Sequence, residues 1–288
     1  MVKTIKQIGE WVRYIGMHRS IDRFPINKPE NNTHPRIVAT MTSLPERMEH
    51  VDAAINSILN QTIPVSEIVF SLPVVSRRTQ EPYVIPERIL NHPRITILRT
   101  QQDYGPITKL LPTLEREWKN PDTLILCIDD DIIYPSSFVG DFLVAREKLG
   151  DVALTGVGYT IPPMMRDVDR QKYKAKGASI KKPKQVDILM GAGGFMVQPK
   201  MFSEDILKTD KIPEEAFFAD DLWISLNLAQ NNIPCYVAPL TLINPVENLR
   251  ISNSQNSLGK TANLNGSNNE KMMRRFAELG ISVNKLFV

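Results

Sequence analysis

Three consecutive aspartates, Asp129, Asp130 and Asp131, stand between two apolar segments, residues 124–128 and 132–135. Carboxylates a few ångströms apart repel one another, and burial between apolar flanks adds to the cost. A divalent cation would neutralise them, and ligand sets made only of oxygen suit Mg²⁺ or Mn²⁺, which commonly contact substrate phosphates as well. The alternative is a solvated acidic turn, which the apolar flanks disfavour. The sequence therefore predicts a metal site.

The spacing of the three aspartates suggests unequal roles. In an extended chain, successive side chains point to opposite sides. Asp129 and Asp131 would then converge on one point, while Asp130 would point away. We expect Asp131 to be the direct ligand of the metal and Asp129 to assist it.

A second acidic pair, Asp220 and Asp221, precedes a segment with helical spacing of apolar residues, 222–229. Carboxylates at a helix N-terminus can act simply as caps that the helix dipole favours. A cap needs one residue, so a pair suggests that one carboxylate faces a pocket. A carboxylate within hydrogen-bond reach of a hydroxyl is a suitable general base.

The segments around these aspartates alternate between strand-like and helix-like patterns. Strands are predicted at residues 36–40, 67–71, 95–98 and 123–128, and helices from Pro45 to residue 59 and over residues 108–118. This alternation predicts an α/β fold in which helices cover a mostly parallel sheet. Ligands of such folds bind at the carboxyl ends of the strands, where the first aspartate cluster is expected.

The chain reads as one domain with two appendages. Residues 1–35 are predicted to form an amphipathic helix and a linker, residues 36–250 the domain, and residues 251–288 a loop and a helix. Two segments rich in polar residues, 162–184 and 253–269, are predicted to be loops.

Residues 127–135 resemble the Asp-x-Asp motif of glycosyltransferases with the type-A fold (GT-A), especially the family-2-like branch. Four further segments resemble the same branch, in the same order along the chain: residues 40–47 the nucleotide-binding loop, 103–110 the lining of the donor pocket, 191–195 the glycine-rich turn beside the sugar, and 219–224 the acidic motif with the catalytic base. The resemblance covers residues 36–239. It implies a single Rossmann-like GT-A domain that uses a nucleotide-sugar donor.

Several polar residues of these segments have a chemical reading of their own. Thr40 and Ser43 carry hydroxyls where a strand gives way to a loop, able to meet a base or ribose. Arg47 could bind phosphate through two N–H groups, or be a surface arginine. Lys109 could balance a diphosphate, or be an ordinary exposed lysine. Asp103 could accept a hydrogen bond from a uracil imide.

The glycine-rich segment has two readings. Gly191, Gly193 and Gly194 would let the backbone approach a ligand closely or adopt positive φ, or would simply form a tight turn. With the resemblance, the predicted donor-binding residues are Thr40, Ser43, Arg47, Asp103, Lys109, Asp129, Asp130, Gly193 and Gly194.

The function that this resemblance implies is metal-dependent transfer of a sugar from a nucleotide-diphosphate donor, with a UDP-sugar favoured. The acceptor is expected to be a hydroxyl of a glycan or glycolipid, in surface polysaccharide or glycolipid synthesis. If the reaction inverts configuration, Asp221 is the base and Asp220 holds the acceptor or a neighbouring loop, although the two could be exchanged.

Three other classes of function fit the sequence less well. Phosphohydrolases with an aspartate nucleophile want a small hydroxyl residue soon after the aspartates, whereas Ile132, Ile133 and Tyr134 follow here. Nucleotidylyltransferases share the fold class, but their glycine-rich, arginine-containing first loop is absent from residues 40–47. A non-catalytic sugar- or metal-binding module would not need Asp220 and Asp221.

Composition narrows the class of protein further. Of the 288 residues, 42% are hydrophobic, and the net charge of +3 is spread along the chain, which argues against a nucleic-acid partner. Cys127 and Cys235 lie in apolar runs and read as core residues; they are too few for a disulfide framework, which fits a cytoplasmic protein.

Two basic segments leave alternatives open. Residues 1–19 could form a basic amphipathic helix at the inner face of a membrane, or a helix packed on its own domain. The lysine-rich segment 172–184 could be a solvated loop, close over the diphosphate or contact an anionic acceptor.

Overall fold

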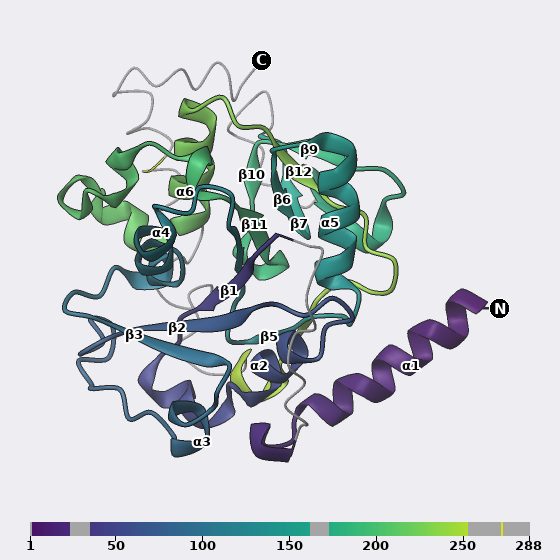
Figure 1. Cartoon of the computed structure of the whole chain (residues 1–288), viewed down its shortest axis with the longest axis horizontal. Helices are drawn as coiled ribbons and strands as arrows, with labels where there is room; N and C mark the ends of the chain where they lie inside the picture. Colours follow the sequence, from purple (N-terminus) through teal and green to yellow (C-terminus); the bar gives the residue numbers. More distant parts are fainter. Residues whose placement is uncertain (1, 24–34, 162–172, 253–271, 273–288) are drawn as a thin grey trace.

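The chain folds into alternating strands and helices. Figure 1 shows the computed structural model, which describes residues 2–23, 35–161, 173–252 and 272. The described strands are β1 (Ile37–Met41), β2 (Glu67–Pro73), β3 (Ile95–Thr100), β4 (Leu124–Cys127), β5 (Ile132–Ile133), β6 (Ala153–Thr155), β7 (Val157–Tyr159), β8 (Lys174–Lys176), β9 (Lys184–Val186), β10 (Ile188–Leu189), β11 (Phe195–Val197), β12 (Cys235–Val237) and β13 (Val246–Glu247). The described α-helices are α1 (Val2–Met17), α2 (Asp52–Leu59), α3 (Glu87–Leu90), α4 (Leu111–Glu117), α5 (Phe138–Leu149), α6 (Asp220–Gln230) and α7 (Leu249–Ser252).

Eight of these strands form one open sheet in the order β3-β2-β1-β4-β11-β6-β12-β9. The first four pair in parallel, and β6 and β12 run in the same direction as they do. Only β11 and β9 run the opposite way within this sheet. The predicted α/β class with a mostly parallel central sheet is thereby confirmed.

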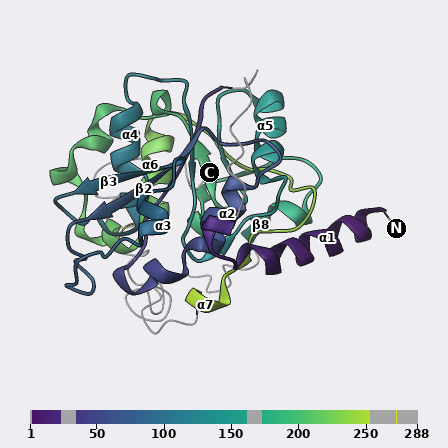
Figure 2. The same cartoon turned by 60° about the horizontal axis from the view of Figure 1, so that its bottom comes forward.

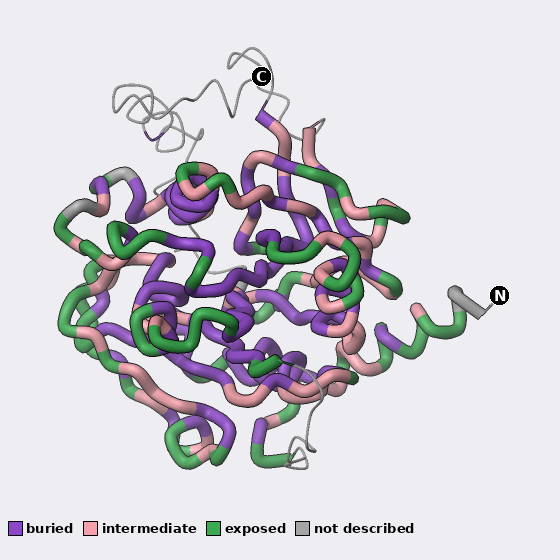
Figure 3. The backbone as a smooth tube through the Cα atoms, turned by 45° about the horizontal axis from the view of Figure 1, so that its top comes forward, coloured by how far each residue is buried: buried purple, intermediate pink, exposed green. Residues whose placement is uncertain are grey.

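Helices cover both faces of the sheet, and alternate residues of β4 point to the two layers. Leu124 and Leu126 belong to the core that also includes residues of α2 and α5. Ile125 and Cys127 belong to the core that includes residues of α4 and α6. Figure 3 shows the buried chain at the centre of the molecule. Cys127 and Cys235 are free and buried, as predicted.

The predicted elements agree with the structure where the apolar pattern is clear. All four predicted strands form. The predicted helix over residues 108–118 is divided into a short 3₁₀ helix, η3 (Gly105–Lys109), and α4, which begins with Pro112 in its first turn. The predicted helix from Pro45 likewise begins as a 3₁₀ helix, η2 (Pro45–His50), before α2.

The loop predicted over residues 162–184 is wrong for its second part. Residues 162–172 lie outside the described residues, but β8 pairs with β7, and β9 pairs with β12 at the sheet edge. Short strands with exposed lysines lack a clear apolar alternation, so the sequence pattern did not indicate them. The predicted C-terminal loop at 253–269 also lies outside the described residues.

Helix α1 lies beside α2 and extends away from the body of the molecule (Figure 2). Within the described part of the chain, none of the helices has both the length and the apolar character needed to cross a bilayer.

Candidate active site

A cavity of about 490 Å³ opens at the carboxyl ends of β1 and β4. Thr42 and Ser43, which follow β1, line it together with the three aspartates that follow β4. Asp220 and Asp221, the first two residues of α6, also line the cavity, although they lie far from the other residues in the sequence. Both acidic motifs predicted from the sequence therefore face one space. Six aspartates and four cationic side chains line this cavity.

One group of lining residues, the Arg47 set, consists of Ser43, Arg47 and Asp130. The Ser43 hydroxyl donates to Asp130 Oδ2 at 2.5 Å, and Arg47 Nη1 donates to Oδ1 at 2.9 Å. Arg47 stands on η2, whose first residue is Pro45. Burial acts to lower the pKa of Arg47, but Asp130 and Asp131 outweigh it and leave that pKa raised. The guanidinium therefore stays charged and holds the buried Asp130 in place.

The second group, the Lys109 set, consists of Lys109, Asp129, Asp220 and Asp221. Lys109 Nζ donates to Asp129 Oδ1 at 2.7 Å and lies 3.1 Å from Asp220 Oδ2. Only 4% of the Lys109 residue is exposed. Burial would lower the pKa of Lys109, yet the three aspartates hold it well above its ordinary value. A single ammonium thus faces three carboxylates.

Asp221 differs from the other two carboxylates of this set, because no ion pair joins it directly to the ammonium in the described part of the chain. The Gly191 N–H donates to its Oδ1 at 2.8 Å. Burial raises the pKa of Asp221 to about 8; Asp220 adds to the rise, and Lys109 opposes it. The carboxyl is therefore poised to take up or release a proton near neutral pH.

Gly191 lies where the second set converges. A Cβ at this position would lie 2.5 Å from Lys109 Nζ, 3.1 Å from Asp221 Oδ1 and 3.3 Å from Asp129 Oδ2. Any other residue would push the lysine away from its aspartates. The groups that lie close to the backbone at Gly191 are protein side chains, so the predicted close approach to a ligand stays a prediction.

The expected alternation of the three aspartates is wrong, because the chain turns at Asp130 and Asp131 instead of remaining extended. Asp129 contacts Lys109, whereas Asp131 Oδ2 lies 3.6 Å from the same Arg47 nitrogen that binds Asp130. Burial, Asp130 and Asp129 raise the pKa of Asp131 to about 7. Asp131 is thus the least neutralised carboxylate of the three.

The carboxylates suit a divalent cation by their chemistry, although the described residues form no complete cage for one. In the described part of the chain, no group of three or more His, Cys, Asp or Glu side chains is arranged to hold a metal ion. Mg²⁺ is usually bound through one or two carboxylates, with substrate phosphates and waters as its other ligands. The excess of carboxylate over cationic side chains in the cavity fits an ion shared with a phosphate ligand.

Three predicted donor-binding residues do not line the cavity. Thr40 is fully buried, and its hydroxyl donates to the Lys109 carbonyl oxygen at 2.5 Å. At Gly193 a Cβ would lie 2.3 Å from the Val157 nitrogen. Gly194 has a φ of +64°, and a Cβ there would lie 2.8 Å from the Tyr134 ring. Thr40 therefore positions Lys109, and the two glycines lie in the tight turn between β10 and β11, which is the alternative that the sequence left open.

Asp103 does line the cavity, but both of its oxygens are engaged. Oδ2 accepts from the Arg77 N–H and Oδ1 from the Gly105 N–H, each at 2.7 Å. These bonds tie the loop after β2 to the turn before η3. Asp103 therefore shapes the cavity wall.

Sequence reasoning missed Arg78, which lines the cavity from the loop after β2. Its buried Nη2 has no hydrogen-bond partner among the described residues. Burial and the nearby Arg47 lower the pKa of Arg78. The adjacent basic residues Arg77 and Arg78 after a predicted strand were the available signal. Lys174, from the basic segment whose role the sequence left open, also lines the cavity.

No protein-family model matches the chain, and a search of curated proteins found no match. The assignment of a function therefore depends on the chemistry of this cavity and on the motifs that the sequence carries.

Proposed function

We propose that this protein is a metal-dependent glycosyltransferase of the GT-A type, which moves a sugar from a nucleotide-diphosphate donor to an acceptor hydroxyl. The observation that carries the proposal is the convergence of Lys109, Asp129 and Asp221 on Gly191, inside a cavity that also contains the Arg47 set. A donor with two phosphates needs cationic groups to bind them, and an acceptor hydroxyl that must lose a proton needs a basic carboxylate. This cavity contains both kinds of group.

The donor phosphates would be held by cationic groups of the cavity. Arg47 already binds Asp130, so it offers charge with part of its fork engaged. Arg78 has a buried N–H donor without a partner among the described residues, which a phosphate oxygen would satisfy. Asp131, assisted by the Oδ2 oxygen of Asp129, would hold a Mg²⁺ or Mn²⁺ ion. When bound, this ion offsets the charge on the diphosphate leaving group.

The acceptor would be activated by Asp221. As the acceptor oxygen bonds to the anomeric carbon, the bond from that carbon to the diphosphate breaks, and the hydroxyl proton passes to Asp221. A base with a pKa near the working pH suits this step. Asp220 and Asp129 keep Lys109 in place, and Lys109 in turn keeps Asp221 from rising further in pKa. We infer inversion of configuration, because a single base that deprotonates the acceptor hydroxyl suits direct attack on the anomeric carbon from the face opposite the diphosphate.

The test is donor binding with and without Mn²⁺, followed by turnover. Thermal shift and calorimetry would be measured with UDP-, GDP-, CMP- and dTDP-sugars for the natural chain, Asp131→Ala and the control Asp122→Ala, whose aspartate lies on the surface beside Lys200. We expect one nucleotide class to bind with Mn²⁺, loss of binding in Asp131→Ala, and no change in the control. Equal affinity of all three proteins would overturn the proposal.

The stereochemistry is tested separately on the product. NMR of the anomeric proton would report inversion or retention. Retention would remove Asp221 from the role of base while leaving the donor site intact.

A further inference from the structure

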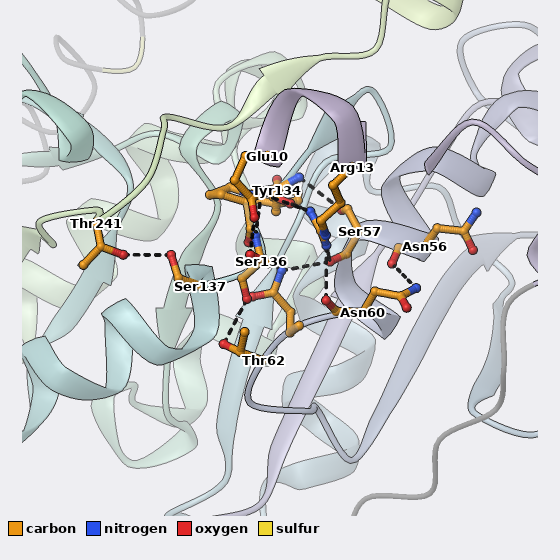
Figure 4. A network of polar contacts seen from close by, with 12 residues as sticks. Glu10, Arg13, Asn56, Ser57, Asn60, Thr62, Tyr134, Ser136, Ser137 and Thr241 are labelled. Atoms are coloured by element: carbon orange, nitrogen blue, oxygen red, sulfur yellow. Dashed lines mark hydrogen bonds and ion pairs between the residues drawn. The ribbon is translucent and has the colours of Figure 1, made fainter. Parts of the chain in front are cut away.

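Helix α1 contacts the body of the molecule through its polar side. Arg13 donates to the backbone oxygens of Tyr134 and Ser57, each at 3.0 Å. Glu10 accepts from the Ser136 N–H at 3.1 Å and from its hydroxyl. Figure 4 shows both side chains directed into this network. Glu10 is buried, so its contacts cannot be exchanged for water without moving the helix.

The apolar side of α1 faces outward. Ile5, Ile8, Val12 and Ile15 recur at the spacing that places them on one helix face, and between 59% and 72% of each residue is exposed. Trp11 borders this face and is half exposed. Turning the helix to bury these side chains would leave Glu10 and Arg13 without their partners. The polar network therefore fixes the apolar face toward the surroundings, and such faces commonly mark an interaction site.

Within residues 2–19, positive charges outnumber negative ones, and one exposed carboxylate, Glu247 of β13, lies beside Tyr14 of α1. Glu10 is the single acidic residue between residues 2 and 19, and it is buried. Lys6, Arg19 and Arg250 are exposed, and Arg250 lies close enough to His18 to lower the pKa of that imidazole, after burial as the larger cause. An apolar face with a tryptophan at its border and flanking cations suits the boundary between lipid headgroups and acyl chains.

We infer that α1 docks this protein on an anionic lipid surface through Ile5, Ile8, Val12 and Ile15. A second copy of the chain fits less well. At ~1.5 Å per residue and a width of ~10 Å, the 16-residue helix offers a footprint of about 240 Å². Stable protein interfaces need about 800 Å² per partner. A bilayer requires no facing surface, so a projecting helix can insert alone (Figure 2).

Substitutions at two glycines on the same side of α1 can distinguish docking on lipid from docking on a second copy of the chain. A Cβ at Gly9 or Gly16 would meet no atom within 4 Å, so a larger side chain there is compatible with the fold. In lipid, Gly9→Leu adds buried apolar surface and strengthens binding. In a closely packed helix pair, the same change would force the helices apart and weaken it.

The experiment is co-sedimentation of the full chain with vesicles of phosphatidylcholine alone or mixed with phosphatidylglycerol, together with sedimentation velocity without lipid. We expect binding to the anionic vesicles, about tenfold weaker for Val12→Asn and stronger for Gly9→Leu. Val144→Asn, which changes an apolar residue on α5 that is 51% exposed against 66% for Val12, is the control and should bind as the natural chain does. Thermal unfolding of each variant verifies folding.

Three outcomes would overturn the inference: no vesicle binding, binding that Val12→Asn leaves unchanged, or a dimer that Gly9→Leu and Val12→Asn both disrupt. Donor binding is measured on the same variants and is expected to stay unchanged, so failure of lipid docking is distinguishable from failure of the proposed enzyme function.

Discussion

The Arg47 set and the Lys109 set line the same cavity, yet their charges are balanced differently. In the Arg47 set, one guanidinium and one hydroxyl hold one buried carboxylate. In the Lys109 set, one ammonium serves three carboxylates. The balanced set can be fixed before any ligand arrives. The under-neutralised set must take up a proton or a cation, so chemistry that moves protons is expected there.

The largest effect is expected when the Lys109 set loses its cation. Lys109→Met leaves the buried Asp220 and the half-buried Asp129 without their partner and should lower the free energy of unfolding by about 3 kcal/mol. Urea unfolding measures this. Lys200→Met removes a more exposed lysine that pairs with Asp122 and Asp151, and should cost about 1 kcal/mol or less. Equal losses in both variants would contradict the difference between the sets.

The next effect concerns turnover. Asp221→Asn keeps the size of the side chain and removes its basicity, so kcat should fall by about 10³-fold with little change in donor affinity. Steady-state kinetics and calorimetry measure the two quantities. Asp187→Asn is the matched control, since Asp187 also accepts a backbone N–H and has a pKa raised by burial, outside the cavity. An Asp221→Asn protein with full turnover would remove this residue from the mechanism.

The same aspartate predicts a pH dependence of stability. Asp221 has a pKa of about 8 in the folded chain, against about 4 in an unfolded one, so the folded state binds an extra proton between these values. The free energy of unfolding of the metal-free protein should therefore fall as pH rises through this window. Asp221→Asn should be more stable than the natural chain at about pH 9 by about 1–2 kcal/mol, with a smaller advantage at about pH 5. Chemical unfolding at both pH values tests the sign.

The smallest effect is expected in the balanced set. Arg47→Lys keeps the charge beside Asp130 but loses the planar fork, which should cost about 1 kcal/mol of stability. Donor KM should rise while kcat stays within about twofold. A drop in kcat as large as that of Asp221→Asn would show that both sets take part in the chemical step.

How far the sequence predicted this arrangement depends on the range of the contacts. The strand before Asp129 and the acidic start of α6 were predictable, because apolar runs and helical spacing are local signals. The turn at Asp130 was not, since it depends on Arg47, 83 residues away in sequence, and on Ser43. Arg78 was missed for the same reason: only the folded chain places the loop after β2 beside this cavity.

Of the two predictions for α1, packing on its own domain is confirmed, and contact with a membrane stays a prediction. The helix packs on its own domain, yet with its polar side, which periodicity alone cannot reveal because it shows the two faces and not which one is covered.

Tyr134 has a practical consequence for anyone who prepares this protein. Its carbonyl accepts from Arg13 of α1, and its hydroxyl accepts from the Asp129 N–H at 3.0 Å. A shortened chain that begins at residue 35 would keep every described strand and therefore the whole central sheet. It would nevertheless lack the donor that anchors Tyr134, and with it one support of the acidic turn. An affinity tag is therefore better placed at the C-terminus. Removing the first helix to improve crystallisation is expected to disturb the acidic turn of the cavity.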